Sequence, residues 1–179
     1  MKYTKLFVGA MLMVSAAMAG AANFSTTQTI DLKSGDGLLT GSFGNSYAGS
    51  NLKGLTFEDT FNFTVPSFSN VNAALVSLSS TQVAGLKFTS FDLYSGSTLL
   101  ASGDVGSFGG LALGGLSFDG AQPAGLYSLK VDGKFTGTSG GSYGGNLNVS
   151  PVPEPESWSM LALGLAGVGF LARRRKSAV

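Results

Sequence analysis

The residue types that perform most enzymatic chemistry are scarce in this sequence. Its 179 residues include no Cys and no His. Without Cys there can be no disulfide framework, thiol nucleophile or thiolate metal site. Without His, the commonest general base and the commonest metal ligand are both missing. The composition therefore predicts a protein with no catalytic residues, no metal site and no cofactor.

Two short segments have spacings that resemble those of a catalytic motif and of a metal-binding loop. Ser50 and Lys53 have the S-x-x-K spacing of Ser/Lys acyl enzymes, but that chemistry needs a helix start. The flanking Gly49 and Gly54 favour a loop instead. The segment 31–37, DLKSGDG, offers two Asp residues for Ca²⁺, yet it lacks the spacing of an EF-hand loop. A plain hairpin turn is the favoured interpretation there.

The stretch FEDTFNFTV, residues 57–65, places a carboxylate among aromatic residues. Strand alternation puts Asp59 on the same face as the phenylalanines and Glu58 on the other, so these two acids cannot act as a carboxylate pair. A buried carboxylate needs a partner. The candidates are a lysine, backbone N–H groups or a cation, and a β-bulge would instead turn the side chain to the surface. The candidate lysines are Lys87, Lys130 and Lys134.

The residues that surround this stretch predict an all-β body over residues 22–150. Short apolar-alternating segments are separated by Gly, Ser and Asn turns. This pattern predicts an antiparallel, jelly-roll-like β-sandwich, with the Gly-rich segment 102–120 mostly a long loop or flap. The expected strands are Phe24–Leu32, Leu38–Phe43, Leu55–Val65, Ala74–Ser80, Leu86–Tyr94, Ser97–Ser102, Gly115–Phe118, Gly125–Phe135 and Ser142–Val149.

The charge of the body differs from that of the whole chain, which is +1. Residues 22–156 hold ten acidic and five basic side chains, which gives −5, and they include no Arg. Nucleic-acid binding requires clustered Lys and Arg to displace counterions. The sequence therefore predicts no nucleic-acid partner.

The N-terminal residues 1–21 read as a secretory signal peptide. Lys2 and Lys5 form a charged start, an apolar run follows, and small residues supply a cleavage site near residues 17–21. An uncleaved anchor helix is the alternative. We therefore expect an exported protein whose mature chain begins near residue 22.

The C-terminal residues 151–179 form a second distinct segment. A proline-rich hinge leads to the apolar run 158–172, and the basic residues 173–176 follow. Fifteen helical residues span about 22 Å, which is short for a hydrocarbon core of about 30 Å. A membrane anchor, a buried core helix and a cleaved sorting signal are the three alternatives. The run and its basic end include Trp158, Leu161, Leu163, Leu165, Phe170, Arg173, Arg174 and Arg175.

This C-terminal pattern resembles a known sorting signal. Pro153, Glu154 and Pro155, followed by an apolar helix and an Arg cluster, are similar to the PEP-CTERM signal of Gram-negative bacteria. The resemblance implies a precursor held in the inner membrane and cleaved near the triplet by an exosortase after export. It also implies a host that makes exopolysaccharide, and a mature protein at the cell surface, in the outer envelope or outside the cell.

Within the body, Phe57, Asp59 and Phe61 resemble the FxDxF group of PEP-CTERM proteins. The resemblance supports a structural role for the three residues and implies no enzymatic activity. The leading hypothesis is thus an exported, non-enzymatic surface or matrix protein.

Two alternatives accompany this hypothesis. The first is a module that binds carbohydrate, exopolysaccharide in particular, through exposed Tyr47, Tyr94, Tyr127 or Tyr143. The second is a hydrolase of matrix polymers, which would need convergent carboxylates on a concave face.

Overall fold

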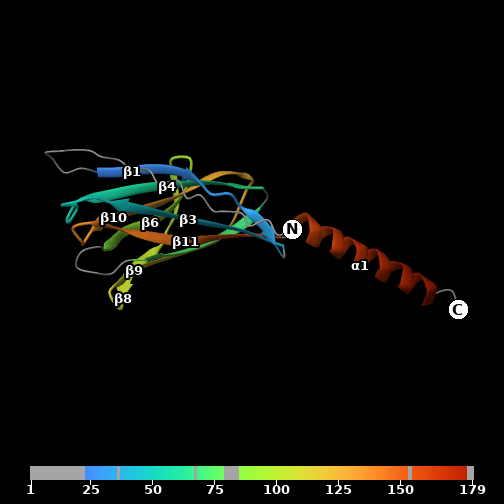
Figure 1. Ribbon diagram of the computed structural model, residues 1–179. Helices are drawn as coiled ribbons and strands as arrows, with labels where there is room; N and C mark the ends of the chain where they lie inside the picture. Colours follow the sequence, from blue (N-terminus) through green and yellow to red (C-terminus); the bar gives the residue numbers. More distant parts are fainter. Residues whose placement is uncertain (1–22, 36, 67, 79–84, 153–154, 177–179) are drawn as a thin grey trace, which may run out of the picture.

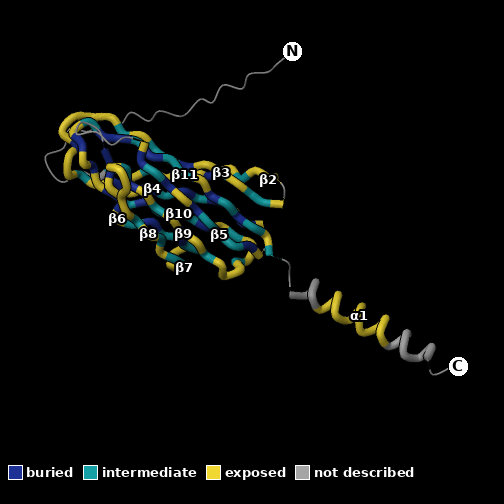
Figure 2. Tube along the Cα trace, turned by 90° about the horizontal axis from the view of Figure 1, so that it is seen from below, coloured by how far each residue is buried: buried dark blue, intermediate teal, exposed yellow. Residues whose placement is uncertain are grey.

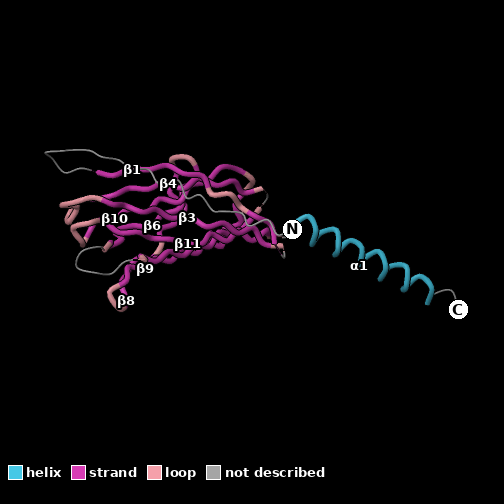
Figure 3. The backbone as a smooth tube through the Cα atoms, viewed as in Figure 1, coloured by secondary structure: helices cyan, strands magenta, loops and turns pink. Residues whose placement is uncertain are grey.

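The computed structural model describes residues 23–35, 37–66, 68–78, 85–152 and 155–176. Two β-sheets pack face to face, and one helix, α1 (Pro155–Lys176), projects from the end of the sandwich (Figures 1 and 3). The predicted all-β sandwich is therefore confirmed. The predicted signal peptide, residues 1–21, lies outside the described residues.

The two sheets contain five and six strands. The first has the order β1-β4-β10-β6-β7, and the second has the order β2-β3-β11-β5-β9-β8. The strands are β1 (Asn23–Thr29), β2 (Lys33–Gly35), β3 (Leu38–Ala48), β4 (Thr56–Val65), β5 (Ser69–Ser77), β6 (Leu86–Ser95), β7 (Thr98–Ser102), β8 (Asp104–Phe108), β9 (Leu111–Gln122), β10 (Gly125–Phe135) and β11 (Gly140–Pro151).

The first strand differs from the expectation in two ways. The segment predicted as one strand, 24–32, ends at Thr29 because the chain then crosses to the other sheet, where β2 begins at Lys33. The buried side chain of Ile30 marks this crossing, and its N–H donates to the carbonyl of Asn62 at 2.7 Å. With β2 and β3 in the other sheet, β4 returns beside β1 and pairs with it in parallel. This edge pair is parallel, whereas the other strand pairs are antiparallel as predicted.

The core lies between the inward faces of the two sheets. Strand alternation produces it, since in β4 every second residue from Phe57 to Val65 is buried. Figure 2 shows the same alternation along the other central strands. The largest fully buried side chains are Phe57, Phe61, Phe63, Phe91, Phe135, Leu93, Leu129 and Leu147.

The Gly-rich segment 102–120 is a β-hairpin rather than a long loop. Strands β8 and β9 pair from Asp104 opposite Gly115 to Phe108 opposite Leu111. The two residues between them, Gly109 and Gly110, have φ angles of 59° and 86°. A two-residue turn with two positive φ angles matches the twist of a hairpin, and Gly-Gly favours it. The prediction of a loop was wrong because these glycines permit a tight turn between two paired strands.

The helix α1 extends beyond the predicted run of 158–172 at both ends. It begins at Pro155, a residue suited to the first helical turn because its missing N–H would have had no partner there. Its apolar residues between 160 and 168 are exposed, including Leu161, Leu163 and Leu165, so the alternative of a buried core helix is wrong. Within the part of the chain that the structure describes, no helix reaches the length and apolar character that a membrane crossing requires. The predicted membrane span is not confirmed.

One glycine of β10 controls how closely the aromatic core approaches the backbone. The pairing of β10 with β6 shifts register between Asp132 and Gly133. A Cβ atom at Gly133 would overlap the ring of Phe57 and lie 2.6 Å from the carbonyl oxygen of Lys87. The backbone oxygen cannot move freely, so this position accepts no side chain without a shift of the strand.

We therefore expect Gly133→Ala to lower the free energy of unfolding by about 2 kcal/mol, the usual scale of overpacking. Urea denaturation measures the change. The matched control is Gly106→Ala, because a Cβ atom at Gly106 meets nothing within 4 Å. Equal stability of the two variants would contradict this account.

Candidate functional site

The acidic residue singled out in the sequence is fully buried. Asp59 has 0% exposure, and its neighbours on the same face, Phe57 and Phe61, have 2% and 1%. The three residues follow one another along the inward face of β4 because side chains two apart share a face. The alternative of surface exposure through a bulge at Asp59 is wrong.

Four side chains donate hydrogen bonds to the carboxylate of Asp59. Thr26 Oγ1 lies 2.6 Å from Oδ1, while the hydroxyl groups of Tyr47 and Tyr143 both lie 2.5 Å from Oδ2. The Asn45 amide Nδ2 is 3.2 Å from each oxygen and also donates to Thr26 Oγ1 at 3.0 Å. Hydroxyl and amide groups therefore satisfy both oxygens.

These partners come from both sheets. Thr26 on β1 is the cross-strand partner of Asp59 on β4, and Asn45 on β3 is the cross-strand partner of Tyr143 on β11. Tyr47 follows Asn45 by two residues and so lies on the same face. The Thr26–Asp59 pair of one sheet thus faces the Asn45–Tyr143 pair of the other across the core. The hydrogen bonds to Asp59 join the two sheets. We call these five residues the Asp59 cluster.

The phenylalanines on either side of Asp59 hold the tyrosines in place. Tyr143 stacks on Phe57 with ring centroids 5.8 Å apart and meets Phe61 edge to face at 6.3 Å. Tyr47 lies against Phe57 at 5.3 Å and against Phe135 at 5.1 Å. The F-x-D-x-F spacing therefore places a carboxylate between two rings that enclose the tyrosine bonded to it.

The side chains that bond to Asp59 are hydroxyl and amide groups, which were not among the expected partners, and the three candidate lysines lie elsewhere. Lys87 and Lys134 are exposed and directly opposite each other in β6 and β10, and Lys130 lies 4.9 Å above the ring of Tyr94. All three lysines occupy the outward face of the five-stranded sheet. The informative signal was elsewhere, since Thr26 and Asn45 are polar residues at inward positions of their own strands.

Burial governs the titration of the two tyrosines. Desolvation raises the pKa of Tyr143 far above its usual value, and the adjacent carboxylate of Asp59 raises it further. The same two causes raise the pKa of Tyr47, and the hydrogen bond with Asn45 opposes them in part. Both phenols therefore remain protonated donors over the whole physiological range of pH.

Acidic residues also meet on the outward face of the five-stranded sheet. Glu58 does point away from Asp59, as expected, but its cross-strand partner is Asp132. Partial burial raises the pKa of Asp132, the hydrogen bond from Ser90 Oγ (2.9 Å) lowers it, and the charges of Glu58 and Asp92 raise it. Among the described residues, no group of three or more acidic side chains is arranged to hold a metal ion.

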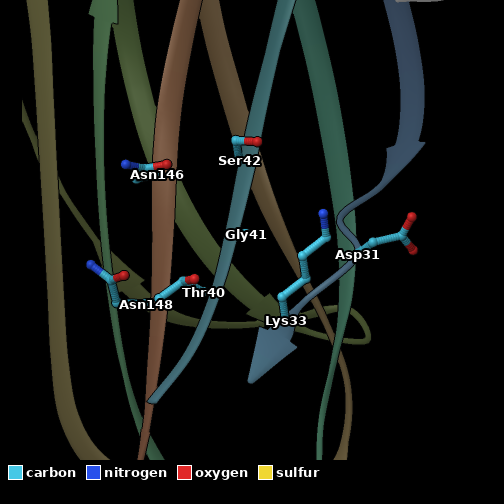
Figure 4. A pocket seen from close by; sticks show the side chains of 7 residues that line it. All are labelled: Asp31, Lys33, Thr40, Gly41, Ser42, Asn146 and Asn148. Atoms are coloured by element: carbon cyan, nitrogen blue, oxygen red, sulfur yellow. The ribbon is translucent and has the colours of Figure 1, made fainter. Parts of the chain in front are cut away.

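A polar pocket of about 310 Å³ opens on the six-stranded sheet, where the crossing from β1 to β2 meets β3 and β11 (Figure 4). Two of its cross-strand pairs each join an amide to a hydroxyl, Asn146 with Ser42 and Asn148 with Thr40. We call it the amide–hydroxyl pocket. It is lined by Asp31, Lys33, Thr40, Gly41, Ser42, Asn146 and Asn148.

Three of the tyrosines proposed to stack on sugars, and the Ser50 and Lys53 pair, form no site in the structure. Tyr127 and Tyr143 have 3% and 2% exposure, and Tyr47 is committed to Asp59, so these tyrosines offer no face for stacking on sugars. Ser50 and Lys53 lie in a loop rather than at a helix start, as the flanking glycines indicated.

The C-terminal residues named from the sequence fall into two groups. Pro153 and Glu154 lie outside the described residues, whereas Pro155 begins α1. The residues of the apolar run and the basic end, from Trp158 to Arg175, all belong to α1.

Comparison with protein families identifies this tail. Residues 151–176 match the model of the PEP-CTERM protein-sorting motif. The chain therefore carries this motif, and the resemblance drawn from its sequence is confirmed. The match does not extend to the body, so membership of the FxDxF group stays a prediction. No curated protein matches the chain.

Several solved structures resemble the sandwich at low identity. The pre-peptidase C-terminal domain of a Bacillus anthracis collagenase is 14% identical, with a TM-score of 0.33, and the match covers 75% of this chain and 98% of that domain. Salmonella Typhimurium PliG, a periplasmic inhibitor of g-type lysozyme, is 15% identical with a TM-score of 0.35. That match covers 70% of this chain and 98% of PliG. The C-terminal CBM6 of LamC from Zobellia galactanivorans is 14% identical with a TM-score of 0.29. That match covers 68% of this chain and 88% of the CBM6 domain. Likeness at this level carries no argument about function.

The Asp59 cluster makes a direct prediction about stability. Asp59→Asn keeps the shape of the side chain but replaces one acceptor oxygen with an NH₂ group, which faces donors. We expect the free energy of unfolding to fall by roughly 2 to 4 kcal/mol, because buried donors lose their acceptor. Asp104→Asn on the exposed strand β8 is the control for loss of charge, and urea denaturation measures both. If Asp59→Asn lowers the free energy of unfolding no more than Asp104→Asn does, the Asp59 cluster does not stabilise the fold.

The raised tyrosine pKa values make a second prediction. Unfolded tyrosines ionise near pH 10.0, whereas the folded chain keeps these two protonated. Stability is therefore complete below pH 10 and falls above it, by about 1.4 kcal/mol per pH unit for each tyrosine.

Stability curves between about pH 8 and pH 12 test this expectation. Tyr47→Phe combined with Tyr143→Phe should lower stability at neutral pH but flatten its alkaline decline. Tyr94→Phe, outside the Asp59 cluster, serves as the matched variant. An unchanged alkaline slope in the double variant would refute the assignment.

Proposed function

We propose that this chain is the precursor of an exported, non-enzymatic envelope or extracellular protein, sorted and cleaved through its C-terminal tail by an exosortase. The PEP-CTERM motif over residues 151–176 carries the proposal. The motif implies export and a precursor attached to the membrane through its sorting signal. In this proposal the partners are the secretion machinery and the exosortase of a Gram-negative host, and the mature form resides at the cell surface.

The junction between body and tail supports this proposal. The last strand, β11, ends at Pro151, and the N–H of Val152 donates to the carbonyl of Phe68 at 2.8 Å. The last strand pairing of the sandwich thus ends just before the Pro-Glu-Pro triplet at residues 153–155. The apolar residues of α1 between 160 and 168 whose burial is described are exposed, so they form no part of the buried core of the sandwich. Cleavage within residues 153–155 would remove no strand.

The non-enzymatic part of the proposal rests on the chemistry of the body. The most buried carboxylate, Asp59, is fully occupied by side chains of the fold, so it is unavailable to a substrate. The sequence provides neither His nor Cys as an alternative base or nucleophile. The paired acids Glu58 and Asp132 lie on the outward face of a sheet, and they are not brought together with Asp59.

Replacement of the motif triplet tests the sorting proposal. In a Gram-negative host with an exosortase, we expect the wild-type chain to lose its tail and leave the membrane fraction. The chain with Pro153→Ala, Glu154→Ala and Pro155→Ala should keep the tail, because the protease no longer recognises it. Intact-mass measurement after membrane fractionation gives the result.

Pro66→Ala is the control, because Pro66 is an exposed proline of the body and lies outside the matched residues 151–176. This variant should be processed like the wild type. A wild-type protein that retains residues 158–179 in the exporting host would refute cleavage through this tail.

A further inference from the structure

The amide–hydroxyl pocket continues into a larger polar surface. In the pairing of the six-stranded sheet, Asn148 connects Thr40 on β3 to Asn72 on β5, and Asn72 is paired with Ser117 on β9. All four side chains are exposed or half-buried, and they occupy outward positions of neighbouring strands. A row of uncharged hydrogen-bonding groups therefore crosses four strands, starting at the pocket.

A second row runs beside the first. It joins Ser42, Asn146, Ala74 and Gly115, whose side chains are small. Adjacent strands are about 4.8 Å apart, and outward positions of one strand repeat about every 6.8 Å. The two rows thus form a grid of six hydrogen-bonding side chains and two small apolar positions, Ala74 and Gly115, with no bulky side chain in either row. An extended ligand can lie along it.

The side chains of the grid are donors and acceptors at once. A carboxamide offers two N–H groups and one oxygen, and a hydroxyl both donates and accepts. Sugar hydroxyl groups have the same dual character. Within the grid only one pair of groups is internally bonded in the structure, Ser117 Oγ to Asn72 Oδ1 at 2.6 Å. The other side-chain donors and acceptors of the grid are on the outward face, where the hydroxyl groups of a ligand can replace water as hydrogen-bond partners.

The lining also excludes the other common classes of ligand. Asp31 and Lys33 are the two charged residues of the pocket and have opposite signs, so neither a polyanion nor a polycation is favoured. None of the seven lining residues is aromatic or has a large apolar side chain, which disfavours a hydrophobic ligand. A neutral, hydroxyl-rich chain is the class that fits.

We propose that the amide–hydroxyl pocket and its adjoining grid bind a neutral glycan chain by hydrogen bonding, without aromatic stacking. This proposal places carbohydrate binding on the six-stranded sheet rather than on the tyrosines. It goes beyond export and sorting and does not rest on them, since binding can be measured in the purified chain whether or not its tail is cleaved. Binding is weak at a single site, because exposed hydrogen bonds with sugars only replace those with water.

Affinity electrophoresis of the full-length chain in neutral detergent tests the proposal. The probes are dextran, laminarin and galactomannan as neutral glycans, with alginate as the acidic comparison. We expect retardation by at least one neutral glycan and none by alginate. Retardation by alginate alone, or by none of the four, would overturn the proposal.

Variants of the pocket locate the site. Asn146→Ala combined with Asn148→Ala should weaken binding at least tenfold, whereas Asn62→Ala, on the outward face of the other sheet, should leave it unchanged. Thermal denaturation checks folding of each variant. Thr40→Val with Ser42→Ala removes two hydroxyl groups at nearly constant volume and gives an independent test should the first variant misfold. Unweakened binding in a folded pocket variant would contradict this location.

Discussion

The carboxylate of Asp59 is the interaction that the rest of this sandwich depends on. It lies in a core otherwise made of aromatic and aliphatic side chains, and its donors come from both sheets. The hydrophobic effect is non-directional and scales with the apolar area that is buried. Hydrogen bonds are directional, so the Asp59 cluster restricts the sheets to the one alignment that brings Thr26, Asn45 and the two tyrosines together. The parallel edge strand β1 is held in the same way, through Thr26.

The sequence alone allowed the all-β class, the inward face of β4 and the sorting tail to be predicted. Each of these depends on local information, either alternation within one strand or a motif read along the chain. One failure, the hairpin within 102–120, concerned a local turn, whereas the others arose where the outcome depended on pairing between distant segments. The break after Thr29 and the parallel pairing with β4 follow from which sheet β2 joins, and no local pattern specifies that. The partners of Asp59 were missed for the same reason, because they lie up to 84 residues away in the chain.

Two different uses of polar residues emerge from the two faces of the six-stranded sheet. On the inward face, Asn45 is satisfied by fixed neighbours and serves the fold. On the outward face, Asn146 and Asn148 lie beside small residues at the amide–hydroxyl pocket. An asparagine on the inward face of a strand therefore serves the fold, whereas one on the outward face is accessible to a ligand. Composition cannot separate these roles, whereas the strand register does so at once.

The position of β11 has a consequence for the order of assembly. It is the last strand of the body in the chain, yet it lies in the interior of its sheet, between β3 and β5, and contributes Tyr143 to Asp59. A chain that emerges from a translocation channel with its N-terminus first must therefore leave β3 and β5 unpaired along these edges until residue 151 has passed. Only then does the sorting tail follow. The sorting motif directly follows the strand that completes the sheet, so every strand of the body leaves such a channel before α1 does.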